Sequence, residues 1–129
     1  MNPLESIFNA EIRKREEIKQ SVRKLRQEER TKANKFIDEI FNEISFLNNY
    51  GICVSRRESE PRIRISRYGS ISLPVRLKEI EGETYSCYTL DRNRLHFEPD
   101  YGICIYQKSE YDWPLEKIVE YYAKRAKLN

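Results

Sequence analysis

Apolar residues in the first third of the chain recur every three or four positions, as on one face of a helix. Pro3 suits a first helical turn, and neither Pro nor Gly occurs again before Gly51. Gly51 can adopt the left-handed conformation that often ends a helix. The pattern predicts one long helix over about residues 3–49. Two helices with a break near residues 28–31 are the alternative.

The two halves of this predicted helix differ in character. From residue 33 onward the apolar stripe is wide, which predicts docking on the body of the domain. Before residue 33 the stripe is thin and the charge is heavy, so this half is expected to project, pair with another helix or fray. We therefore divide the single domain into a charged N-terminal helical arm, 1–32, and an α+β core, 33–129.

Between residues 51 and 108 the apolar period changes to two. Ile71, Leu73, Val75 and Leu77 alternate with polar residues, and the stretch around Ile63 shows the same alternation. Such alternation predicts strands with one buried and one wet face. Turn residues separate the strands closely, which favours an antiparallel β-meander of five or six strands. Pro74 inside one pattern predicts an edge or bulged strand.

A second helix is predicted over about residues 112–128. Asp112 can cap it, and Pro114 falls in its first turn. We expect Trp113 and Tyr122 to close the core where this helix docks. The predicted fold class is α+β: a long N-terminal helix, the antiparallel meander, and a C-terminal helix packed on the sheet. The predicted packing face of the second helix comprises Leu115, Ile118, Val119, Tyr122 and Ala126.

The sequence also predicts in which cellular compartment the protein is located. No secretory-type start is present, and no apolar run reaches the roughly 20 residues that span a bilayer. Cys53, Cys87 and Cys104 lie among β-forming residues without metal-type spacing, which predicts buried, reduced thiols. These features predict a cytoplasmic protein that does not bind membranes.

Catalytic chemistry has little support in the sequence. His96 is the single histidine, and in a strand it shares a face with Glu98, its candidate ion-pair partner. The cysteines lack zinc-type spacing, and the four glycines form no phosphate-binding loop. We therefore expect a non-enzymatic protein with no cofactor and no metal, and a catalytic His96 is the alternative.

Charge is distributed unevenly along the chain. The formal net charge is +3, yet residues 13–35 carry ten Lys/Arg against four Glu, and residues 56–78 carry seven against two. Residues 79–120 carry four basic against ten acidic residues. The molecule is therefore expected to be electrically lopsided, a property that steers charged partners.

The first basic region places five residues on one side of the predicted helix, at spacings that keep them within about 80° of one another and along roughly 22 Å. Such a ridge suits a run of nucleic-acid phosphates. The alternative is a solvated face beside a coiled-coil-like helix–helix interface made by Ile18, Val22 and Leu25. The basic ridge comprises Arg15, Lys19, Arg23, Arg26 and Arg30.

The second basic region lies on predicted strands and turns and contains six Arg and one Lys. Arg favours bidentate contacts with phosphate or carboxylate, and a sheet face with Arg and Tyr can bind single-stranded nucleic acid. An acidic protein surface, or cross-strand pairing with the chain's own residues 79–83, are the alternatives. The candidate binding residues are Arg56, Arg57, Arg62, Arg64, Arg67, Tyr68 and Arg76.

Two functional hypotheses follow. The first is a non-enzymatic binding protein, of the small regulator or inhibitor type, that acts on nucleic acid or a nucleoprotein complex through the two basic surfaces. The second is a protein–protein interaction or assembly module that forms a homodimer or docks a partner through its N-terminal helix.

Overall fold

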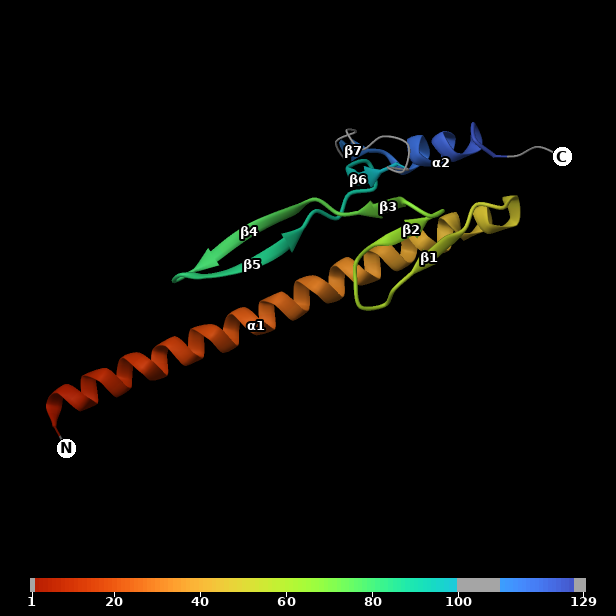
Figure 1. Cartoon of the computed structure of the whole chain (residues 1–129). Helices are drawn as coiled ribbons and strands as arrows, with labels where there is room; N and C mark the ends of the chain where they lie inside the picture. Colours follow the sequence, from red (N-terminus) through yellow and green to blue (C-terminus); the bar gives the residue numbers. More distant parts are fainter. Residues whose placement is uncertain (1, 100–109, 127–129) are drawn as a thin grey trace.

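The computed structural model describes residues 2–99 and 110–126. The described chain is elongated, with one long helix running along its whole length (Figure 1). Helix α1 (Pro3–Ile44) is continuous through residues 28–31, so the predicted long helix is confirmed without a break. A 3₁₀ helix, η1 (Ser45–Tyr50), completes it and ends at Gly51, whose φ of 77° is left-handed as predicted.

The strands form two antiparallel sheets in place of one continuous meander. The order in the main, five-stranded sheet is β1-β2-β3-β6-β7, and β4 and β5 pair only with each other. The α+β prediction with an antiparallel sheet is confirmed. The main-sheet strands are β1 (Val54–Arg56), β2 (Ile63–Ile65), β3 (Gly69–Ser72), β6 (Leu95–Glu98) and β7 (Glu110–Trp113).

The chain leaves the main sheet at Pro74, between β3 and β4 (Val75–Ile80), and returns after β5 (Glu83–Tyr88). Pro lacks the N–H that a continuing strand would donate, so the ladder ends there. The predicted single strand through residue 77 is therefore wrong. Leu73 is buried, but Val75 and Leu77 are 51% and 73% exposed instead of facing the core.

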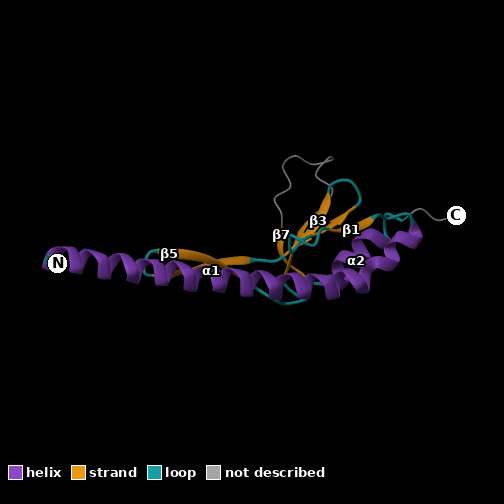
Figure 2. Cartoon of the chain, turned by 90° about the horizontal axis from the view of Figure 1, so that it is seen from below, coloured by secondary structure: helices purple, strands orange, loops and turns teal. Residues whose placement is uncertain are grey.

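The β4–β5 hairpin lies along the N-terminal half of α1 (Figures 1 and 2), with β5 as the strand in contact with the helix. Val22 is 0% exposed beneath it. This half of α1 was expected to project, pair with another helix or fray. The hairpin instead packs on α1 around Val22, near the middle of the helix, and the first turns of α1 extend past the tip of the hairpin (Figure 1).

The core lies between the main sheet and the two helices. Inward-facing Ile63, Ile65, Ile71, Leu95 and Phe97 pack with the wide apolar stripe of α1 and with Leu115, Ile118 and Tyr122 of α2. The rings of Trp113, Tyr121 and Tyr122 all contact Phe97 edge-on. The C-terminal helix therefore packs on the sheet as predicted.

Two details of the sequence analysis need correction. Helix α2 spans Leu115–Ala123 with Pro114 at its N-cap, because Asp112, the predicted cap, belongs to β7. Cys87 is buried as predicted, but Cys53 is exposed, since it alternates with the inward-facing Ile52 and Val54. Cys104 lies outside the described residues, as does the predicted strand around it.

Candidate nucleic-acid interface

The basic ridge lies on α1 beside the stripe that the β4–β5 hairpin covers. All five of its side chains are exposed. Val22 faces the hairpin. Arg23 and Arg26 follow it by one and four positions, and the helical repeat therefore places both on the same side of the contact between Val22 and the hairpin. The ridge therefore forms a basic wall along one side of the helix–hairpin junction.

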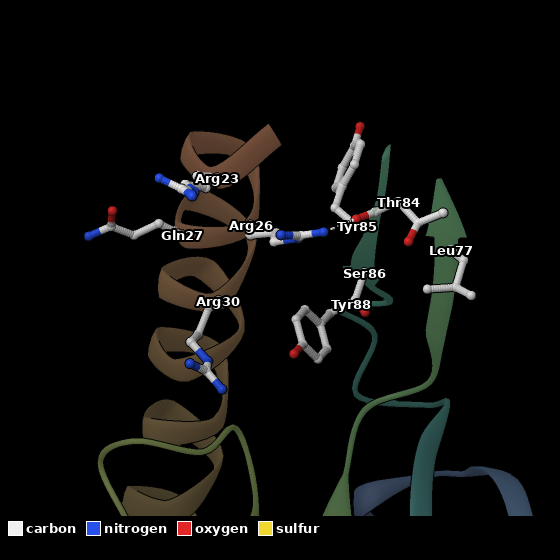
Figure 3. Close-up of a pocket in the computed structure, with 9 residues that line it drawn as sticks. All are labelled: Arg23, Arg26, Gln27, Arg30, Leu77, Thr84, Tyr85, Ser86 and Tyr88. Carbon is white, nitrogen blue, oxygen red and sulfur yellow. Dashed lines mark hydrogen bonds between the residues drawn. The ribbon is translucent and has the colours of Figure 1, made fainter. Parts of the chain in front are cut away.

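The wall and the hairpin enclose a groove of about 730 Å³. Arg23, Arg26 and Arg30 line it from the helix, and the hairpin supplies hydroxyl, aromatic and apolar groups (Figure 3). Arg15 and Lys19 continue the ridge toward the N-terminus beyond the groove. The remaining lining residues are Gln27, Leu77, Thr84, Tyr85, Ser86 and Tyr88.

Arg26 fixes the spacing between the two walls. Its Nη2 atom donates a hydrogen bond to the carbonyl oxygen of Thr84 over 2.5 Å, across the groove (Figure 3). Arg23 and Arg30 lie on either side of it on the helix. One guanidinium therefore joins helix and hairpin, while its two neighbours remain available to a ligand.

The hairpin side of the groove is unusually apolar and aromatic for an exposed surface. Strand register puts Leu77 opposite Ser86 and Val75 opposite Tyr88, so these four side chains share one face of the hairpin. The ring of Tyr88 extends toward the helix (Figure 3). The rings of Tyr85 and Tyr88 are half-buried, whereas Leu77 is exposed. Half-buried rings and exposed apolar side chains beside guanidinium groups can contact the flat face of a nucleobase.

The charge of the groove is not neutralised within the described chain. None of Arg23, Arg26 and Arg30 forms an ion pair with a carboxylate among the described residues. Elsewhere in the chain such ion pairs do form. Arg92 Nη1 lies 2.6 Å from Glu43 Oε2, and this carboxylate raises the pKa of the Arg92 guanidinium. The groove therefore combines three cationic groups that form no ion pair among the described residues.

The arginines of the second basic region have different roles in the structure. Arg56 is structural: its side chain is 6% exposed and donates to Asp38 Oδ1 at 2.8 Å and to Asn34 Oδ1 at 2.7 Å on α1. It also donates to the carbonyl oxygens of Arg57 and Glu60. Its guanidinium is therefore already saturated by the fold.

The other arginines of this region are exposed but scattered. Arg57, Arg62 and Arg64 line a smaller hollow of about 320 Å³ that also contains Glu60. Arg67 and Tyr68 lie at the exposed β2–β3 turn. Cross-strand pairing of Arg62 and Arg64 with residues 79–83 does not occur, because those residues belong to the other sheet. Arg76 lies opposite Cys87 in that sheet, outside the groove lining.

The predicted helix–helix interface is placed under the hairpin. Val22 is fully buried there, and Ile18 and Leu25 on either side of it are half-buried. A helical partner would have to displace the hairpin to reach Val22. Pairing of the N-terminal helix with a second chain through these three residues stays a prediction.

His96 lies on β6 with its Nε2 atom 3.6 Å from Glu98 Oε1, the partner the strand pattern indicated. No cluster of three metal-ligating side chains occurs within residues 2–99 and 110–126. Over the same ranges, no helix is long and apolar enough to cross a membrane. His96 and the groove residues lie on different sheets, so the histidine does not belong to this site.

The arginines on the helix side of the groove were among the candidate binding residues predicted from spacing along α1, whereas none of the hairpin residues that line the groove was predicted. Thr84, Ser86 and Tyr88 alternate along β5, which is a readable signal for one strand face. That face lies beside the arginines because the hairpin leaves the main sheet at Pro74, and the direction in which it leaves could not be predicted from local sequence patterns.

No protein-family model matches this chain, and no curated protein or solved structure is significantly similar to it. The functional conclusion therefore depends on the geometry and charge of the groove.

Proposed function

We propose that this protein binds nucleic acid, alone or within a nucleoprotein complex, and acts by binding without catalysis. The observation that carries the proposal is the groove between α1 and the hairpin. It combines three arginines that form no ion pair among the described residues with a hairpin face that carries half-buried tyrosine rings and the exposed Leu77. A regulatory or inhibitory role would follow from occupying the nucleic acid.

Phosphate is the ligand chemistry that the helix wall favours. Guanidinium groups bind phosphate oxygens through parallel N–H donors, and they do so best where no carboxylate competes. Arg15 and Lys19 extend the wall, so the ridge spans roughly 22 Å along the helix axis. That length accommodates several consecutive phosphates of one strand.

The hairpin wall favours bases over a second phosphate chain. Leu77 and Tyr88 offer apolar and aromatic surface within the same groove as the arginines. Stacking of a base on an aromatic ring contributes about 1–3 kcal/mol and tolerates any sequence. An unpaired strand can place its bases there and its phosphates on Arg23 and Arg30.

A titration of the chain into fluorescently labelled single- and double-stranded DNA and RNA, followed by anisotropy at low salt, tests the proposal. The variant Arg23→Gln/Arg30→Gln is expected to bind about a hundredfold more weakly, because it loses two charge-assisted contacts that each contribute on the order of 1.5 kcal/mol. Both side chains are exposed, so the fold should be unaffected.

The matched control is Arg13→Gln/Lys24→Gln. It removes the same charge from exposed positions on the face of the same helix that lies opposite Val22 and is turned away from the hairpin. Equal losses of affinity in both variants would mean that net charge alone explains the effect, and this result would contradict a role for the groove. No binding by the unaltered chain at low salt would instead point to an acidic protein partner, to be captured in a pull-down.

A cytoplasmic location is part of the proposal. It is supported by the free thiols of Cys53, which is exposed, and Cys87. Free thiols persist most readily in a reducing compartment.

A further inference from the structure

Strand β4 forms an open edge of the hairpin. Among the described residues it pairs with β5 alone, and β5 lies between it and α1 (Figures 1 and 3). Residues 75–79 are all exposed, with Val75 and Leu77 at 51% and 73%. An unpaired strand edge presents a row of backbone N–H and C=O groups that can pair with another strand. The edge of β4 is therefore a candidate interaction surface.

The backbone groups that point to this open edge belong to Val75, Leu77 and Glu79. At the start of β4, Thr89 N donates a hydrogen bond to the carbonyl oxygen of Pro74 over 2.9 Å. In an antiparallel pair, residues that bond to the partner strand alternate with residues whose N–H and C=O point away from it. Counting from Pro74, the even-numbered residues of β4 face β5 with their backbone groups. The odd-numbered residues are left to bond to an added strand.

Two cationic side chains on this edge indicate the charge of the strand that would fit it. Arg76 and Lys78 lie on one face of the hairpin, directly opposite Cys87 and Tyr85 of β5, so no carboxylate lies directly across from either of them. Neither forms an ion pair within residues 2–99 and 110–126. Glu79 projects from the other face, as do the exposed apolar residues of β4. Cationic and apolar positions therefore alternate along the edge.

A second copy of β4 fits this edge poorly. Two antiparallel copies related by a two-fold axis place residues of the same face opposite each other. A register centred on residue 77 puts Arg76 opposite Lys78 twice, and registers centred on residues 76, 78 or 79 put a charged residue opposite its own copy. Like charges directly opposite destabilise a strand pair. The edge therefore favours a different chain that carries acidic residues.

We propose that the edge of β4 binds an extended segment of another protein in which acidic and apolar residues alternate. The segment adds to the hairpin as a third, antiparallel strand, and its main chain bonds to the outward groups of β4. Its acidic side chains lie opposite Arg76 and Lys78, and its apolar side chains lie opposite Val75 and Leu77. In this arrangement the two cationic residues occupy non-hydrogen-bonded positions, where opposite side chains approach most closely. A slip by one residue would place apolar side chains on the charges, so the pattern sets the register.

Fluorescence anisotropy with a labelled, capped peptide of alternating valine and glutamate tests the charge pattern. The full chain should bind this peptide, and a peptide of alternating valine and lysine should bind about tenfold more weakly or worse. Arg76→Glu/Lys78→Glu should invert this preference, because the complementarity is then reversed. Arg62→Glu/Arg64→Glu makes the same change of charge at exposed positions on or beside β2, and this matched control should keep the original preference.

Glu79→Pro tests the backbone pairing. The N–H of residue 79 points to the open edge, so proline there removes a donor from the added strand and none from the β4–β5 pair. Affinity for the glutamate peptide should fall about tenfold. Glu79→Ala removes the same carboxylate and keeps the N–H, so it should bind as well as the unaltered chain. Slow amide hydrogen exchange in β5 reports whether the hairpin is intact, and the charge inversion decides the matter if proline loosens it.

Four results would overturn the proposal: no binding of the glutamate peptide, no inversion of preference by the charge exchange, full binding by Glu79→Pro with an intact hairpin, or a dimer of the unaltered chain that Glu79→Pro abolishes. Weaker peptide binding by Arg23→Gln/Arg30→Gln would also contradict it, because the peptide would then lie in the groove. Arg76, Lys78 and Glu79 do not line the groove. Nucleic-acid binding and strand addition can therefore fail independently.

Discussion

Arg26 and Arg56 have different roles in the structure, although both lie in basic regions of the sequence. Both were candidates for binding a partner. Arg26 has one hydrogen bond, to Thr84, in an open groove. Arg56 is enclosed by Asn34, Asp38 and two carbonyl groups. The number of protein acceptors around a guanidinium separates a structural arginine from one that can bind a ligand.

Replacement of Arg56 should therefore affect stability. Arg56→Ala leaves acceptors on α1 and in the β1–β2 loop without their donor, which we expect to cost about 2–3 kcal/mol. Urea unfolding followed by circular dichroism measures this loss. Arg56→Lys should recover only part of it, because an ammonium group cannot reproduce the planar fork.

Arg64→Ala is the matched control for this prediction. Arg64 is exposed on the neighbouring strand, opposite Ser55 and Ser70. Its removal should shift the unfolding midpoint little. Equal midpoints for Arg56→Ala and Arg64→Ala would contradict the structural role of Arg56.

At the scale of elements, helix α1 and the strand alternation were predictable because each follows from local periodicity. The helix spans 42 residues without interruption, and its end at Gly51 could be read directly. The inward faces of β2 and β3 also followed from alternation. These features can be predicted without knowing any contact between residues that are distant in the sequence.

The position of the β4–β5 hairpin was not predictable in the same way. Pro74 marked an irregularity, but the sequence alone allowed an edge strand or a bulge. The hairpin instead left the sheet and packed on α1 near Val22, a contact between residues about sixty positions apart. The hairpin wall of the candidate site was missed for this reason, whereas the helix wall depended only on spacing along α1.

A two-stranded hairpin is marginal alone and needs a packing surface. Val22→Ala should therefore loosen the hairpin, at a cost of about 2 kcal/mol from lost burial and the cavity created. Amide hydrogen exchange in β4 and β5 should accelerate while exchange in β2, β3 and β6 is nearly unchanged. Ser21→Ala, at the exposed neighbouring position, should leave both regions as they are. Equal acceleration in both sheets would contradict the assignment.

At the scale of the whole molecule, three features follow one another along α1: exposed apolar residues at its N-terminal end, the basic groove at its middle, and the buried core at its C-terminal end. Figure 2 shows the hairpin and the main sheet at successive positions along this helix. Their separation means that each can be altered without the others. The core provides stability, while the two exposed surfaces are available to partners. Charge asymmetry in the sequence anticipated the basic surface, but only the fold shows that it borders an aromatic wall.

The salt dependence of nucleic-acid binding tests most directly whether Arg23 and Arg30 bind phosphates in the groove. The logarithm of the association constant should fall linearly with the logarithm of salt concentration, and each phosphate contact contributes about 0.7 to the slope for single strands. Arg23→Gln/Arg30→Gln should therefore reduce the magnitude of the slope by about 1.4. An unchanged slope in this variant would contradict phosphate binding by these arginines, because the phosphates would then be bound elsewhere on the molecule.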